Sequence, residues 1–377
     1  MGLVNALKPL QLARSDQVDK ALQKLASSSF SRIFRLVLPA TAATIISWLI
    51  CNLGFYATAA QSDAFWLHTN TPKPSKNGYE AVGDLLYGLK ATWIYRLENP
   101  YDQPQWALIY LLQGSIMIIS ALSLVVTMTS RWRTVTLFLL TCWSLDWSGM
   151  LGDPLTGFCC FLGIVLAECN LSNIPRLIAP YSPFVSPPTI LLSLFLMSYP
   201  ASYPETAFWS TWLRDIARNY FPVTTLGVVE RLYGSIGGVL LIAAIIISPH
   251  ARWALSRKPL LWLGKASFAI YLLHGMFLRT VFAWILHLGQ SKVITTKQAD
   301  DGFGKLVEHY PLPGTSQRVL ATVVMGVCVA IASHFWNSKL EPVFAKITSK
   351  LEGIVSGNAQ IKDSLSNTGP LLPLRKD

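Results

Sequence analysis

The chain has 377 residues, of which 52% are hydrophobic and 14% are charged, and its mean hydropathy is +0.41. A soluble globular protein carries about 25% charged residues, so this composition excludes an ordinary soluble enzyme, a disordered chain and a secreted disulfide scaffold. Residues 36–62 and 103–130 contain no Lys, Arg, Asp or Glu. Each window exceeds the roughly 20 apolar residues that a membrane-spanning helix needs. The sequence therefore predicts a polytopic membrane protein.

In chain order, the apolar segments predict an all-α transmembrane helical bundle of about eight spans. The predicted spans cover residues 36–56, 106–128, 134–151, 153–168, 189–203, 235–248, 267–288 and 318–336. Gly152 to Pro154 break the third and fourth spans into a tight hairpin, and two long loops follow the first and seventh spans. The predicted organisation is a basic amino-terminal segment (1–35), a membrane domain (36–336) and a polar, partly disordered tail (337–377).

The basic residues predict the orientation of the bundle. With a cytosolic amino terminus and eight alternating spans, the cytosolic pieces hold 19 basic and 7 acidic residues. The pieces on the opposite side hold 11 basic and 13 acidic residues. This asymmetry is the one expected from the positive-inside rule. Both termini are therefore predicted to be cytosolic, in an endomembrane such as the endoplasmic reticulum. The net charge of +11 is explained by this orientation, and no nucleic-acid partner is expected.

The cysteines show no pattern of a redox or metal site. There are six, at positions 51, 142, 159, 160, 169 and 328, and none forms a CxxC pair or has a histidine at ligand spacing. We expect small hydrophobic side chains in the membrane helices and no metal site.

The most informative segment is the span that follows Lys265. His274 lies nine residues further on, about 13 Å deeper in the membrane at 1.5 Å per residue. Ser267, Tyr271 and His274 are spaced i, i+4, i+7 and so share one helical face. Lipid cannot satisfy their hydrogen bonds, so this face is expected to point into the bundle. A functional site and a buried histidine with a purely structural role are both compatible with this pattern.

The stretch WLGKASFAIYLLHG around these residues resembles the carboxyl-terminal hallmark of the acyltransferase-3 family. Further stretches resemble its fungal branch in order and spacing: FSRIFRLVLP at 30–39, NPYDQPQW at 99–106, GS at 114–115, AE at 167–168, LFLMSYP at 194–200 and SPHARWALSRKPLLWLG at 248–264. The resemblance implies an integral membrane enzyme that moves an acyl group, commonly acetyl, from cytosolic acyl-CoA to a hydroxyl. It implies acyl-CoA as a co-substrate and no permanently bound cofactor.

The chain also departs from this pattern. Family members begin with two further spans, the first of which carries the histidine thought to act as base. This sequence starts where the second of these spans ends, so either an upstream segment that carries the histidine is missing from it, or that histidine has been lost. Fungal relatives carry Pro, Glu and Arg where this chain has Ile109, Leu111 and Gln113.

The resemblance and the polar pattern together assign roles to eight residues. Arg32 and Arg35 match the family's arginine pair, and with Lys265 they are the candidates for acyl-CoA binding, because guanidinium groups suit phosphate. Positive-inside signalling explains the same charges without a ligand. The catalytic candidates are His274, Tyr271 and Ser267, and Trp106 and Ser115 are the candidates for acceptor binding.

Two other charged residues are predicted to have interfacial positions. Glu168 ends its span at the cytosolic edge. Arg279, five residues past His274, is expected on a different face with its side chain extended toward the lumen.

Two functional hypotheses follow. The first is an O-acyltransferase acting on a small hydroxylated natural product in fungal secondary-metabolite biosynthesis, with the bilayer, acyl-CoA and that acceptor as partners. The second is a catalytically degenerate relative that serves as a membrane binding or partner subunit. The oligomeric state stays open.

Overall fold

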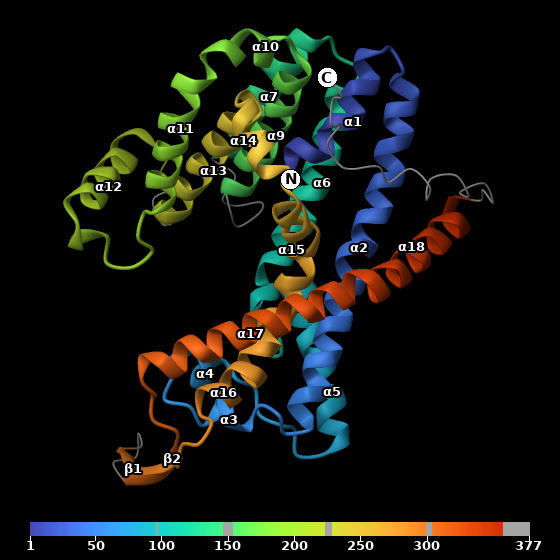
Figure 1. Cartoon of the computed structure of the whole chain (residues 1–377). Coiled ribbons are helices and arrows are strands. Elements are labelled where there is room, and N and C mark those ends of the chain that lie inside the picture. The colour runs from blue at the N-terminus through green and yellow to red at the C-terminus, as the bar shows by residue number, and fades with distance from the viewer. Residues whose placement is uncertain (96, 146–153, 223–227, 299–303, 357–377) are drawn as a thin grey trace. The chain divides into compact units, whose positions relative to one another are not determined.

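The computed structural model describes residues 1–95, 97–145, 154–222, 228–298 and 304–356 (Figure 1). Its regular structure is almost entirely helical, which confirms the predicted all-α class. The chain folds into two compact units. Unit 1 comprises Met1–Ser29 and Tyr110–Leu261, and unit 2 comprises Phe30–Ile109 and the residues from Trp262 onward.

Each of the eight predicted spans falls on a helix. Within the described ranges, six helical stretches are long and apolar enough to cross a membrane: Val18–Asn52, Gln103–Val125, Ile174–Met197, Val229–Ile247, Lys258–Leu286 and Thr315–Val355. The two remaining predicted spans correspond to α7 (Ser130–Ser144) and α9 (Pro154–Leu171), which are shorter. At 1.5 Å per residue α7 is about 22 Å long, less than the ~30 Å of the hydrocarbon core. The predicted hairpin residues Gly152 and Asp153 lie outside the described residues.

Unit 1 contains α7, α9 and most of α6 (Trp106–Val125). Its other elements are α1 (Gly2–Arg14), α10 (Ile174–Ile178), η3 (Ala179–Tyr181), α11 (Ser182–Met197), η4 (Pro204–Thr206), α12 (Phe208–Tyr220), α13 (Val229–Ile247) and α14 (Pro249–Leu255).

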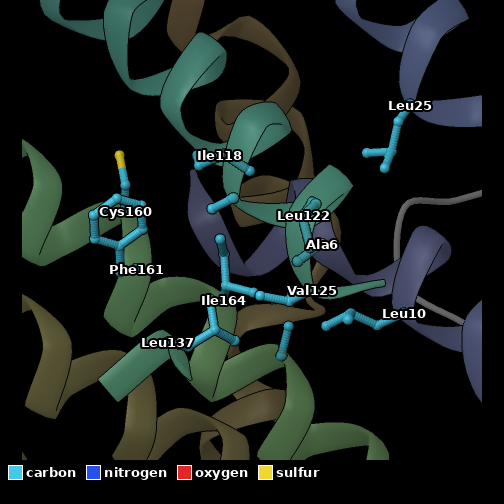
Figure 2. Packing of buried hydrophobic residues seen from close by; sticks show 12 residues of the cluster. Ala6, Leu10, Leu25, Ile118, Leu122, Val125, Leu137, Cys160, Phe161 and Ile164 are labelled. Carbon is cyan, nitrogen blue, oxygen red and sulfur yellow. The ribbon is translucent and has the colours of Figure 1, made fainter. Parts of the chain in front are cut away.

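The core of unit 1 joins residues that are far apart in the sequence. Figure 2 shows Leu10 of α1, Leu122 and Val125 of α6, Leu137 of α7 and Ile164 of α9 in one apolar cluster. Helices α1 and α9 approach very closely where Gly2 meets Gly163. A Cβ on Gly163 would lie 2.8 Å from the Gly2 Cα, so the absence of a side chain permits this contact.

Unit 2 contains most of two long helices, α2 (Val18–Asn52) and α15 (Lys258–Phe277). Its other elements are α3 (Ala57–Ala60), α4 (Phe65–Asn70), α5 (Gly78–Lys90), η1 (Ala91–Tyr95), η2 (Gln103–Gln105), η6 (Leu278–Phe282), α16 (Ala283–Leu286), β1 (Val293–Gln298), β2 (Gly304–His309), α17 (Thr315–Phe335), η7 (Trp336–Leu340) and α18 (Glu341–Ser356). Its main core packs Leu108, Leu272, Met276 and Trp336 together.

The long connection predicted between the first two spans, residues 57–105, is largely helical. Helix α5 begins at Gly78 because Asn77 caps it: the Asn77 side chain accepts a 2.8 Å hydrogen bond from the Glu80 amide. Glu80 Oε2 in turn accepts from the Lys76 amide at 3.2 Å. The second bond goes to the residue before the cap, so the arrangement is similar to a capping box without its reciprocal bond, and its signal in the sequence is Asn-x-x-Glu.

The second predicted loop, residues 289–317, contains a two-stranded antiparallel sheet. Strands β1 and β2 pair with Val293 opposite His309 and Gln298 opposite Gly304. The β-branched run at 293–296 favours this local extension.

The first part of the predicted carboxyl-terminal tail is helical. Helix α18 continues from η7 through residues 341–356. Most of the residues after Glu352, which the sequence predicts to be disordered, lie outside the described ranges.

Candidate functional site

His274 and Tyr271 lie together on α15. Their ring centroids are 6.1 Å apart, and both side chains are half-buried. His274 Nδ1 contacts the carbonyl oxygens of Tyr271 at 2.7 Å and Ile270 at 3.2 Å. A carbonyl oxygen only accepts, so Nδ1 is the donor here, and in a neutral ring the lone pair is on Nε2. The Tyr271 hydroxyl donates to the Pro104 carbonyl oxygen.

Ser267 does not join this pair. Its side chain is exposed, and its hydroxyl donates to the Gly264 carbonyl oxygen of the same helix at 2.9 Å. The structure therefore brings Tyr271 and His274 together and leaves Ser267 apart.

The three basic candidates all belong to unit 2. Arg35 interacts electrostatically with Glu341 at the start of α18 and with Arg32. The Lys265 backbone carbonyl oxygen accepts a hydrogen bond from the Asn337 side chain of η7 at 3.1 Å. Arg32 is half-buried, while Arg35 and Lys265 are exposed.

Trp106 and Ser115 both lie on α6, but in different units. Trp106 is half-exposed. Ser115 is buried, and its hydroxyl donates to the Leu111 carbonyl oxygen of its own helix at 2.9 Å.

A polar network that the sequence interpretation did not assign fills the centre of unit 2. It is built by the segment NPYDQPQW at 99–106. Asn99 Nδ2 donates to Thr44 Oγ1 at 3.1 Å, and Gln105 Nε2 donates to Asp102 Oδ2 at 2.9 Å. All four side chains are buried. Two prolines among four polar residues (Asn99, Asp102, Gln103 and Gln105) at the start of an apolar span were the available signal, and the family resemblance already included this stretch.

Arg279 completes the network, with its side chain inside the protein and its guanidinium at Tyr101, in the connection between the first two predicted spans. The side chain is fully buried, and Nη1 donates to the Tyr101 carbonyl oxygen at 2.7 Å. The guanidinium lies 5.8 Å from the ring centroid of Tyr56 and 5.5 Å from that of Trp66. This placement is within the range of cation–π contacts.

Asp102 and Arg279 are incompletely paired. Asp102 Oδ1, Arg279 Nε and Arg279 Nη2 are buried and have no hydrogen-bond partner among the described residues. The two charges interact electrostatically, but no ion-pair contact joins them in the part of the chain that the structure describes. Burial raises the pKa of Asp102 to about 7, although the Gln105 hydrogen bond and the Arg279 charge oppose this rise.

Gly275 brings this pair next to His274. A Cβ on Gly275 would lie 3.0 Å from Asp102 Oδ1, so the carboxylate rests against the backbone beside His274. Asp102, Arg279, Gly275 and the His274–Tyr271 pair thus form one buried polar region of unit 2, which we take as the candidate site.

Unit 1 contains a different charged cluster, centred on Glu168, the residue predicted to end its span at the cytosolic edge. Glu168 is 3% exposed. It accepts from Arg14 Nη2 at 2.8 Å, from Arg133 Nη1 at 3.2 Å and from the Ser130 hydroxyl. Arg133 also donates to the Val125 and Met128 carbonyl oxygens. This cluster joins α1, α7 and α9.

Two further features of the described residues carry none of the predicted roles. No group of three or more His, Cys, Asp or Glu is arranged to hold a metal ion in those ranges. A pocket of about 540 Å³ in unit 1 is lined by α1, α9 and α13, including Glu230 and Arg231, and it contains no predicted site residue.

Comparison with known proteins gives two matches. Residues 19–335 match the family described as acyltransferase domain, acyltransferase-3. The O-acetyltransferase PaAT-1 of Phomopsis amygdali is 24% identical over 312 residues, which are 74% of this chain and 60% of that protein. The chain thus spans about three fifths of the length of this relative. No solved structure matches.

Proposed function

Because this chain belongs to the acyltransferase-3 family, we propose that it is an integral membrane O-acyltransferase. The donor is acyl-CoA, in the simplest case acetyl-CoA, and the acceptor is a hydroxyl of a small natural product of secondary metabolism. The similar protein from Phomopsis amygdali is an O-acetyltransferase, which supports the choice of acetyl. An endoplasmic reticulum location with cytosolic termini belongs to this proposal.

The observation that carries the proposal is the state of His274. Its Nδ1 proton is held by two backbone carbonyl oxygens of its own helix, so Nε2 is the basic atom and is available to a ligand. A neutral imidazole with an accessible lone pair is the group that general-base catalysis requires.

In the proposed reaction, His274 Nε2 takes the proton of the acceptor hydroxyl. The acceptor oxygen forms a bond to the thioester carbonyl carbon, and the carbon–sulfur bond of acyl-CoA then breaks. The protonated imidazole returns its proton to the leaving thiolate, which leaves an ester and free CoA. Arg32, Arg35 and Lys265 bind the CoA phosphates through charge-assisted hydrogen bonds.

The test is acetyl transfer from acetyl-CoA by the purified full chain, with n-octanol and cyclohexanol as probe acceptors and ester formation as the readout. We expect His274→Gln to lower kcat by about 10²–10⁴-fold. The matched control is His334→Gln, since His334 is an exposed histidine on α17. Arg32→Gln and Arg35→Gln are expected to raise KM for acetyl-CoA. Full transfer by His274→Gln would reject the assigned base.

The second candidate function is a binding subunit without catalysis. The apolar or uncharged residues Ile109, Leu111 and Gln113 favour it, because the fungal relatives that the sequence resembles carry charged residues in this span. Acetyl-CoA binding that depends on Arg32 and Arg35, without ester formation from any acceptor, would support this candidate over the enzyme.

A further inference from the structure

Helices α11 and α13 of unit 1 form an antiparallel pair whose shared end lies at a membrane surface. Both belong to helical stretches that are long and apolar enough to span the membrane. A Cβ on Gly237 of α13 would lie 2.6 Å from the Ser193 carbonyl oxygen of α11. Just past the end of α11, the ring centroid of Tyr199 lies 5.3 Å from that of Tyr233, which precedes Gly237 in α13. The two helices therefore run in opposite directions, and α11 ends near the start of α13.

Helix α12 lies across this shared end. The Leu213 carbonyl oxygen of α12 accepts a hydrogen bond from the Tyr233 hydroxyl at 2.5 Å. The ring centroid of Trp209, also on α12, lies 5.2 Å from that of Phe195 and 6.3 Å from that of Tyr199. Figure 1 shows α12 beside α11 and α13. Because two spanning helices have their ends here, α12 lies at the level where the membrane meets water.

Helix α12 runs along this surface and does not cross the membrane. It has 13 residues, which is about 20 Å at 1.5 Å per residue and less than the ~30 Å of the hydrocarbon core. It also carries three charged residues, Arg214, Asp215 and Arg218. Arg214 lies 3.8 Å from the Glu205 carboxylate, and Arg218 is exposed. Charged side chains are costly inside the bilayer, so this helix belongs to the interface.

One flank of α12 carries aromatic side chains that the protein does not cover. Leu213 and Ala217 are buried against the rest of unit 1, whereas Phe208 is 89% exposed and Trp212 is 54% exposed. Phe208 and Trp212 are spaced i, i+4 and so share one side of the helix. The two arginines, which are also spaced i, i+4, lie on another side. An apolar flank and a basic flank on one short helix are typical of helices that lie in the membrane interface.

The aromatic flank continues an apolar surface of the neighbouring span. Phe195 of α11, which contacts Trp209, is itself exposed, as are Leu191 and Leu194 of the same helix. On a membrane-spanning helix, exposed apolar side chains of this kind meet lipid acyl chains, which are as apolar as leucine. The flank of α12 extends this surface to the membrane boundary, where aromatic rings are favoured.

We propose that α12 is a membrane-interface helix that binds the bilayer surface. Phe208 and Trp212 insert among the lipid chains just below the headgroups, and Arg218 lies at the level of the headgroups. The two arginines of α12 are balanced by Glu205 and Asp215, so the apolar insertion supplies the binding and a zwitterionic phospholipid is sufficient. This inference is independent of the proposed acyltransferase function.

The first experiment places a photoreactive residue, p-benzoylphenylalanine, at position 208 or at position 212 of the full chain. The purified protein is reconstituted in nanodiscs of palmitoyl-oleoyl-phosphatidylcholine and irradiated, and the adducts are identified by mass spectrometry. We expect adducts with one phospholipid at both positions.

The matched control is the same photoreactive residue at Ile294. Ile294 is also apolar and is 60% exposed, but it lies on strand β1, outside the helices that can span the membrane. We expect no phospholipid adduct there. Adducts of positions 208 and 212 with a second copy of the chain in place of phospholipid, or yields of phospholipid adduct no higher than at Ile294, would overturn the proposal.

The second experiment measures hydrogen exchange of the α12 amides in the same nanodiscs. Phe208→Ser removes a side chain that the protein hardly covers, so the variant is expected to fold. If the ring is held by lipid, its loss makes local opening of α12 easier, and we expect exchange to become about tenfold faster or more. Asn219→Ser changes an exposed polar residue of the same helix and should leave the exchange rates unchanged. Equal rates for the wild type and Phe208→Ser would contradict the proposal.

Discussion

Unit 1 and unit 2 each bury a carboxylate with arginine nearby, and they treat it in opposite ways. Glu168 receives hydrogen bonds from two arginines and one serine. Asp102 receives one side-chain hydrogen bond from neutral Gln105, and its Oδ1 has no hydrogen-bond partner among the described residues. Both carboxylates are nearly inaccessible, so burial alone does not distinguish them.

The difference teaches how to separate a structural charge from a functional one. A buried ion pair offsets its desolvation cost only when its geometry is good and its remaining polar atoms are satisfied. The Glu168 cluster meets this condition and connects three helices. The Asp102–Arg279 pair does not meet it, and an incompletely satisfied pair is costly to fold. Such a cost is expected at a functional site rather than in a structural cluster.

The largest expected effect is the loss of stability when the Glu168 cluster of unit 1 is broken. Glu168→Ala leaves Arg133 buried without its counter-charge, and we expect it to destabilise the protein by about 3–5 kcal/mol. The apparent melting temperature of the purified protein in detergent measures this loss. Asp102→Asn serves as the comparison and is expected to cost much less, because no complete ion pair is broken. An unchanged melting temperature for Glu168→Ala would contradict the structural role of the Glu168 cluster.

A smaller effect is expected from pH. Burial raises the pKa of Asp102 from its ordinary value to about 7, so the folded state binds this proton more tightly than the unfolded state. The resulting stabilisation is complete below the ordinary carboxyl pKa, and it is lost as the pH rises toward 7. The slope for one proton is about 1.4 kcal/mol per pH unit.

Melting temperatures of the wild type and Asp102→Asn between pH 5 and pH 8 test this expectation. The wild type should lose stability relative to the variant as the pH rises to 7, with no further relative change above it. Parallel curves for the two proteins would show that Asp102 does not titrate in this range.

The smallest effect concerns the contact beside His274. Gly275→Ala places a Cβ 3.0 Å from Asp102 Oδ1, and this overpacking is expected to cost about 1–3 kcal/mol. Gly264→Ala on the same helix meets nothing within 4 Å, and it is expected to be neutral or stabilising by up to about 1 kcal/mol. The difference in melting temperature between these two variants checks the prediction. Equal values would mean that the carboxylate does not rest against this glycine.

Much of the fold follows from the sequence because hydropathy is a local property. The eight apolar segments were found within a few residues, and the capping of α5 could have been read from Asn77 and Glu80. The position of Glu168 could not, because its partners Arg14 and Arg133 are 154 and 35 residues away. Only the tertiary structure shows that these three side chains meet.

The candidate site was predicted in part. His274 and Tyr271 were selected by depth and helical spacing, and the structure places them together. Ser267 shares their face in an ideal helix, but that part of α15 is exposed. The burial of Arg279 was not predicted, since its contacts with Tyr101 and Trp66 come from a segment far away in the sequence, and the helix changes its period at Leu278–Phe282. A single arginine in an apolar segment gives no sign of such a change.

Because of the π-helical segment η6, the number of residues between His274 and Arg279 matters as much for the direction of Arg279 as the identity of those residues. A wider turn accommodates one additional residue, and in an α-helix one residue corresponds to a rotation of about 100°. The direction of Arg279 relative to His274 therefore depends on how many residues separate them, independently of which residues these are. Among homologous sequences, a one-residue insertion or deletion between these two positions would turn the guanidinium to a different direction relative to His274, even where every polar residue is conserved. An alignment that allows gaps freely in this segment would conceal that loss.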